Sequence, residues 1–191
     1  MEPTLAIVGD SYIWRLEAYL KQLNLSDLSL SPQKVAFFGL GGSSVWGNKP
    51  VVKQLEQAMA LRSINIIYLH IGSNDLCSPQ SAGKTTQLAN NMYSLAKYAL
   101  WGSNASAVVI GQIIPRQKCP HPLYNQLVEE TNQQLYKIGL LHEHPISYAY
   151  LYGLQNPPKQ YYCDLIHLSP RGNKKLYRGI RGAFKRALVS L

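Results

Sequence analysis

The feature that most constrains this fold is an alternation along the 191-residue chain, in which strand-length apolar runs are separated by stretches of helical periodicity. Most runs are apolar at both alternating sets of positions, which is typical of parallel strands covered on both faces. This pattern predicts an α/β protein whose parallel sheet has helices on both sides. We therefore expect a three-layer α/β/α sandwich with a five-stranded parallel sheet, its strands at residues 4–9, 34–38, 64–71, 107–113 and 145–150.

Helices are expected where apolar residues recur at intervals of three and four. Three such sets lie between the strands: Val52, Leu55 and Met59; Leu88, Met92, Leu95 and Ala99; Leu123, Leu127, Leu135 and Ile138. A final helix over residues 169–191 is expected to dock through one apolar stripe, formed by Leu176, Ile180, Phe184, Leu188 and Leu191.

Composition narrows the class of protein further. Hydrophobic residues make up 46% of the chain and charged residues 15%, so a core can form and disorder is not expected. No run approaches the roughly 18 apolar residues of a membrane-spanning helix, and the N-terminus lacks a secretory pattern. Three widely spaced cysteines suit a reducing compartment. We expect one domain over residues 1–191 and a cytoplasmic location.

Positive charge is concentrated near the C-terminus. The formal net charge is +9, and residues 171–191 contain Arg171, Lys174, Lys175, Arg178, Arg181, Lys185 and Arg186 with no acid. Such a helix face is usually just solvated. The alternative is contact with an anionic membrane surface or with nucleic acid, because basic side chains are attracted to a concentrated negative field.

Polar residues follow the expected strands, where parallel sheets place their ligands. Ser11 follows the first strand and stands at the start of a helix. It is a candidate nucleophile; the alternative is an ordinary helix N-cap. After the third, the Asn74 amide can donate to an oxyanion, or Asn74 and Asp75 simply form a turn. The glycine-rich loop at residues 39–44 follows the second strand. Its small residues allow the backbone to come close to a bound group; the alternative is a plain turn.

Asp164 and His167 lie in a loop before the final helix. A histidine at this spacing can donate one ring N–H to the carboxylate and use its other nitrogen as a base; a merely local hydrogen bond is the alternative. Serine at position 44 breaks the dinucleotide-binding pattern, and the segment 142–144 (His-Glu-His) lacks zinc-site spacing. No metal or cofactor is expected.

Together these segments resemble the SGNH hydrolases, also called GDSL esterases and lipases. Four family blocks stand in order: Gly9-Asp10-Ser11, Gly42, Gly72-Ser73-Asn74-Asp75 and Asp164-Leu165-Ile166-His167. The resemblance implies a flavodoxin-like fold and a serine esterase acting on small or lipid acyl esters, acetyl esters included. It assigns Ser11 as nucleophile, His167 as general base and Asp164 as its orienting acid. The implied oxyanion donors are the Ser11 and Gly42 backbone N–H groups and the Asn74 side chain.

Three further expectations depend on the resemblance. Asp10 and Asp75 should organise loops, and the alignment selects Gly42 rather than Gly41 as the second block. Tyr12 stands where the family often has leucine or a small residue, so we expect it to narrow the pocket mouth.

A fainter similarity links residues 71–76 and 167–177 to esterase domains of some animal retrotransposons. It implies one domain of a larger nucleic-acid-handling protein. The rival to an esterase is therefore a binding module that contacts anionic lipid or nucleic acid through its basic helix and hydrolyses esters only incidentally. A carbohydrate deacetylase would share the mechanism. No motif identifies the acyl chain, the alcohol or the oligomeric state.

Overall fold

The sheet in the computed structural model, which describes residues 4–78, 83–141 and 145–191, is parallel throughout and has the strand order β2-β1-β3-β4-β5. The strands are β1 (Leu5–Gly9), β2 (Val35–Gly39), β3 (Ile66–His70), β4 (Ala107–Gly111) and β5 (Ile146–Ala149). All five expected strands are confirmed. The observed ends lie within two residues of the expected ones.

Burial follows the position of each strand in the sheet. The three inner strands, β1, β3 and β4, are buried along their whole length. The edge strands are less covered: β2 is half-buried throughout, and β5 exposes Ser147. Edge strands lack a neighbouring strand on one side, so their side chains are less completely covered.

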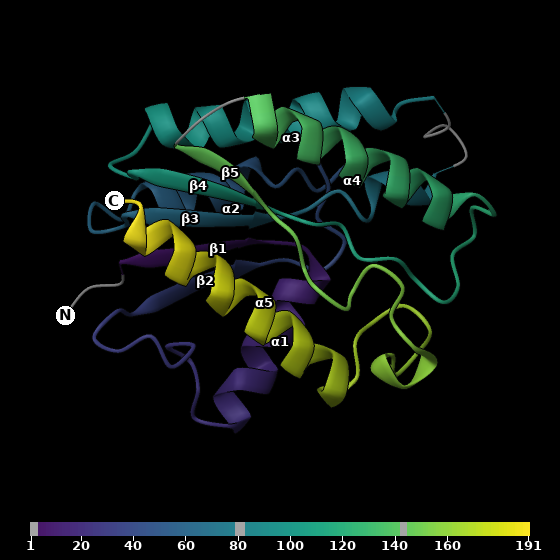
Figure 1. The fold of residues 1–191 in the computed structure, drawn as a ribbon, viewed down its shortest axis with the longest axis horizontal. Helices are drawn as coiled ribbons and strands as arrows, with labels where there is room; N and C mark the ends of the chain where they lie inside the picture. Colours follow the sequence, from purple (N-terminus) through teal and green to yellow (C-terminus); the bar gives the residue numbers. More distant parts are fainter. Residues whose placement is uncertain (1–3, 79–82, 142–144) are drawn as a thin grey trace.

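Helices cover both faces of the sheet, as the three-layer prediction requires (Figure 1). One face is covered by α2 (Val52–Met59), α3 (Thr85–Trp101) and α4 (Tyr124–Leu141), and the other by α1 (Ser11–Gln22) and α5 (Pro170–Val189). No helix in these described ranges is long and apolar enough to cross a membrane.

Two helix-end residues were predicted wrongly. Leu123 precedes α4 and is 49% exposed, because its N–H donates to the His121 ring in the turn before the helix. Leu191 lies beyond the end of α5 and is 57% exposed. The rest of the α5 stripe packs against the sheet: Leu176, Ile180 and Phe184 are fully buried.

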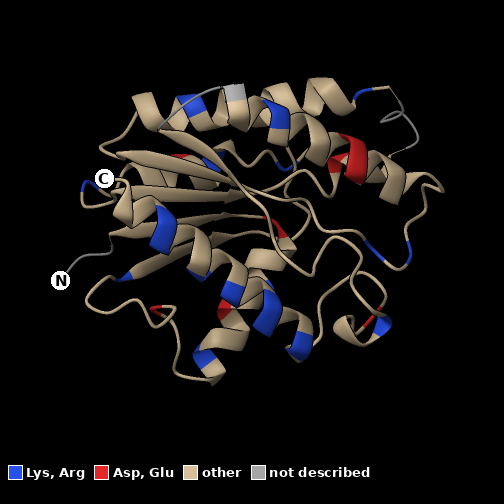
Figure 2. Ribbon diagram, in the orientation of Figure 1, with Lys and Arg blue, Asp and Glu red and all other residues tan. Residues whose placement is uncertain are grey.

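Lys and Arg recur along α5 (Figure 2). Lys174, Arg178 and Lys185 are exposed, while the buried stripe faces the core. The basic face is therefore available to solvent, and its contact with an anionic partner stays a prediction.

Glycine at two strand ends allows close backbone contacts, with α1 at Gly39 and with β3 at Gly9. A Cβ atom on Gly39 would stand 2.3 Å from the backbone nitrogen of Trp14, and one on Gly9 would stand 2.2 Å from the carbonyl oxygen of His70. Neither neighbour is a flexible side chain, so neither can move aside cheaply.

Replacing Gly39 with alanine should therefore destabilise the fold, because the added methyl group meets the backbone of α1. We expect Gly39→Ala to lower the free energy of unfolding by about 1–3 kcal/mol, measured by chemical denaturation. Gly41→Ala is the matched control, since a Cβ there has no atom within 4 Å. Equal stability of the two variants would contradict this account.

Candidate active site

The loops that carry the predicted site residues begin side by side. Gly9 at the end of β1 is in register with Gly39 of β2 and His70 of β3. Ser11, Gly42 and Asn74 follow these three strands in turn. Parallel pairing thus brings residues from three separate segments to one edge of the sheet.

Ser11 is the first residue of α1 and is nearly buried. The N-cap is Asp10, whose carboxylate accepts from the Tyr12 N–H (2.9 Å) and from the Ser73 hydroxyl. The alternative in which Ser11 is the N-cap is therefore wrong. Asp10 joins the loop after β1 to the loop after β3, as expected for a loop-organising residue.

Gly42 has φ +78°, a left-handed conformation that glycine adopts without strain. It lines a cavity of about 630 Å³ together with Asn74, whereas Gly41 is absent from the described lining. Lys49 lies over it: a Cβ on Gly42 would be 3.9 Å from the Lys49 ammonium. This geometry favours Gly42 as the second-block residue.

The loops after β2 and β3 are joined by two side chains. The Asn74 amide donates to the Ser43 carbonyl (2.8 Å), and the Asp75 carboxylate accepts from the N–H groups of Val45 and Trp46 (both 2.9 Å). Burial raises the pKa of Asp75, although these amide hydrogen bonds oppose the shift. The expected loop-organising role of Asp75 is confirmed.

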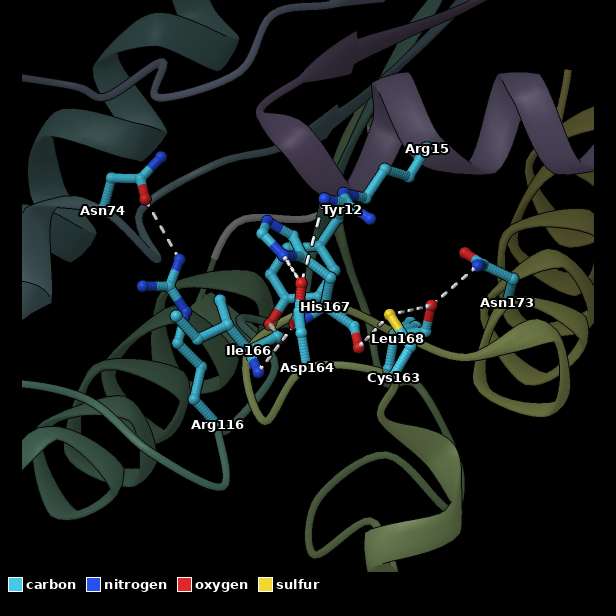
Figure 3. A network of polar contacts seen from close by, with 10 residues as sticks. All are labelled: Tyr12, Arg15, Asn74, Arg116, Cys163, Asp164, Ile166, His167, Leu168 and Asn173. Atoms are coloured by element: carbon cyan, nitrogen blue, oxygen red, sulfur yellow. Dashed lines mark hydrogen bonds and ion pairs between the residues drawn. The ribbon is translucent and has the colours of Figure 1, made fainter.

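His167 and Asp164 form a hydrogen-bonded pair (Figure 3). The imidazole Nδ1 lies 2.7 Å from Asp164 Oδ2, and Oδ1 accepts from the N–H groups of His167 (2.6 Å) and Ile166 (3.1 Å). Burial alone would raise the pKa of Asp164, but these hydrogen bonds lower it to about 2. The ionised carboxylate can only accept, so Nδ1 carries the proton and Nε2 is left unprotonated in the neutral ring.

Tyr12 does not narrow the pocket mouth. It is 1% exposed, its ring packs edge-on against His70, and its hydroxyl donates to the Ile166 carbonyl at 2.8 Å. The ring is buried because it belongs to the α1 face that packs against the sheet. Tyr12 thus links the helix that begins at Ser11 to the turn that carries His167.

The sequence did not single out Arg116, which lies beyond β4 and is 6% exposed. Its guanidinium points toward Asn74 in Figure 3 and donates to Asn74 Oδ1 at 3.0 Å. The one available signal was an arginine directly after an apolar run and a proline, which does not distinguish a buried residue from an exposed one. The segment 142–144 considered for a metal lies outside the described residues.

Comparison with known proteins places the chain in a family. The family model for GDSL-like lipase/acylhydrolase matches residues 5–180. The chain belongs to this family. It is therefore a carboxylic ester hydrolase of the SGNH/GDSL type, with esterase or acylhydrolase activity. No curated protein matches the chain.

Solved structures share the fold of this SGNH/GDSL hydrolase at low sequence identity. A carbohydrate acetylesterase from Sinorhizobium meliloti has a TM-score of 0.73 at 15% identity, over 97% of this chain and 99% of that one. A G-D-S-L family lipolytic protein from Veillonella parvula has a TM-score of 0.71 at 20% identity, over 95% and 98%. A putative platelet activating factor protein from Streptococcus pneumonia has a TM-score of 0.72 at 18% identity, over 96% and 84%.

The lowered pKa of Asp164 predicts a pH-dependent contribution to stability. A carboxyl whose pKa is depressed stabilises the fold above its ordinary pKa of 3.8 and loses that effect as pH falls through about 2. The stability gap between the parent and Asp164→Asn should be larger at about pH 5 than at pH 2, where it narrows. Because the carboxylate is 46% exposed, we expect a gap below about 1 kcal/mol. Denaturation curves at several pH values measure it, and a carboxyl that titrates by NMR near 3.8 would contradict the prediction.

Proposed function

We propose that this protein hydrolyses acyl esters through a Ser11-His167-Asp164 triad and an acyl-enzyme intermediate. The observation that carries the proposal is the hydrogen bond between His167 Nδ1 and Asp164, in a turn that is bonded to Tyr12, the residue after Ser11. It leaves Nε2 as the nitrogen able to accept a proton. A serine hydroxyl is a weak nucleophile near pH 7 until such a base removes its proton.

The chemistry proceeds in two halves. Ser11 Oγ attacks the ester carbonyl carbon while His167 Nε2 takes the hydroxyl proton, and the tetrahedral intermediate then expels the alcohol, which receives that proton. Water attacks the resulting acyl-serine with His167 again as base. The products are the free acid and the regenerated serine.

Three donors are proposed for the oxyanion of the tetrahedral intermediate. The Ser11 N–H belongs to the first turn of α1, where amides have no intrahelical acceptor. The Gly42 N–H and the Asn74 carboxamide come from the neighbouring loops and line the same cavity. Donors held in place before reaction stabilise the oxyanion without reorganisation, and losing one typically costs about 10²- to 10³-fold in rate.

The cavity that Gly42 and Asn74 line favours a polar, negatively charged alcohol group. Its lining residues include Lys49 and Lys84, together with Asn48 and Gln87. Its one carboxylate among the described lining residues, Asp75, already accepts backbone amides. We propose short acyl esters, including acetyl esters, of such alcohols as substrates; a lipid headgroup or an acidic sugar would both fit this description.

Labelling with a fluorophosphonate probe tests the triad. We expect modification of Ser11, located by mass spectrometry, because a base-activated serine attacks phosphorus as it attacks a carbonyl. His167→Ala should lose labelling, and Ser11→Ala should lose ester turnover while unfolding at the parent temperature. A folded parent that is not labelled would favour the rival hypothesis of a binding module, with the exposed basic face of α5 as its contact surface.

A matched pair of acetate esters tests the alcohol site. The parent should have a lower KM for 4-acetoxybenzenesulfonate than for the neutral sulfonamide. Replacing Lys49 and Lys84 with glutamine should raise the KM for the sulfonate by roughly threefold or more and leave the KM for the sulfonamide unchanged. Lys53→Gln is the control, because Lys53 is exposed and outside the described lining. If the double variant changes both KM values by the same factor, the charge preference is wrong.

A further inference from the structure

Arg116 is a buried cation whose head group meets neutral partners. Its guanidinium donates to Cys77 Sγ (2.7 Å), Ser73 Oγ (3.1 Å) and Asn74 Oδ1 (3.0 Å). Among the described residues it forms no ion pair, and its buried Nε finds no acceptor. Burying a charge without an ionic partner is unfavourable, so stability of the fold is a poor explanation for an arginine at this place.

The backbone of Arg116 is held in place by α4. The Asn125 side chain bonds both the N–H (3.0 Å) and the carbonyl (2.9 Å) of Arg116. Seven residues along the same helix, Asn132 makes the same pair of bonds to Ile113 (both 2.9 Å). The Arg116 guanidinium lies over the aromatic ring of Tyr124, whose centroid is 5.3 Å from the guanidinium carbon. The segment after β4 therefore delivers the guanidinium to a defined position.

The Asn74 carboxamide lies between two groups that accept only one of its two orientations. Its Oδ1 accepts from Arg116, and one hydrogen of Nδ2 is donated to the Ser43 carbonyl. A flipped amide would set NH₂ against a guanidinium and oxygen against a carbonyl, so both contacts would be lost. In the observed orientation, the second hydrogen of Nδ2 has no role in holding the side chain and is available to a substrate oxygen.

Building on the proposed function, we propose that Arg116 is a positioning residue for the oxyanion site, holding Asn74 so that an amide hydrogen faces the developing negative charge. The charge-assisted hydrogen bond to Oδ1 also polarises the amide and makes Nδ2 a stronger donor. Arg116 acts through Asn74 and does not itself touch the substrate.

A double-mutant cycle tests this coupling. Arg116→Gln should lower kcat about 10- to 100-fold, the factor that corresponds to one charge-assisted hydrogen bond, and leave KM for a neutral acetate ester nearly unchanged. In an Asn74→Ala background the same substitution should cost less than about threefold, because its target is already gone. Equal losses in both backgrounds would overturn the proposal, since they would show action on the fold or directly on the oxyanion.

Conservative replacement and chemical rescue separate positioning from folding. Arg116→Lys keeps the charge but not the forked donor, so it should recover only part of kcat. Millimolar guanidinium should raise the kcat of Arg116→Ala but not that of the Arg116→Ala, Asn74→Ala protein. If Arg116→Gln does not fold, the cycle is run with Arg116→Lys. Arg178→Gln on the exposed side of α5 should keep parent kinetics.

Failure of this proposal is distinguishable from failure of the triad. A parent protein that the fluorophosphonate does not label at Ser11 would overturn the proposed mechanism. Labelling and turnover that depend on Ser11, together with an Arg116 effect that is absent or independent of Asn74, would leave the triad intact and refute the positioning role alone.

Discussion

Parallel pairing of neighbouring strands is the constraint on which the site depends. Because β2, β1 and β3 run in one direction with Gly9, Gly39 and His70 in register, the loops that follow them start side by side. A nucleophile candidate and its oxyanion donors can then come from three short segments without any long connection. The next strand in the sheet, β4, pairs with β3, and the segment that follows β4 leads to Arg116 at the same carboxyl end of the strands.

Polar side chains, rather than apolar packing, determine how these loops are placed. Asp10 joins the start of α1 to Ser73, Asp75 holds the loop after β2, and Asn74 lies between that loop and Arg116. Most of these groups are buried, so leaving one partner unsatisfied would cost more than it would in solvent. The loops consequently have few alternative conformations, which is the condition that electrostatic preorganisation of an oxyanion site requires.

The histidine turn shows how a short motif gains its rigidity from distant segments. Within residues 164–167, the Asp164 carboxylate bonds the His167 imidazole and accepts from the N–H groups of Ile166 and His167. Leu165 adopts a left-handed conformation with φ +68°. From outside, the N–H groups of Gln117 and Lys118 donate to the Leu165 carbonyl (2.9 and 3.1 Å), and Tyr12 donates to Ile166 across 154 residues of sequence. The His167–Asp164 pair is thereby attached to both α1 and the segment after β4.

Sequence alone determined the features that depend on local pattern: five strands from apolar runs, four helices from apolar spacing, and four family blocks from residue type and order. It did not determine that α4 begins after Leu123 or that α5 ends before Leu191, because neighbouring turn residues decide where the first and last helical hydrogen bonds form. Nor did it determine the direction of the Tyr12 ring or the role of Arg116. Their partners are chosen by strand order, which brings Arg116 to Asn74 from 42 residues away, and no local pattern encodes that pairing.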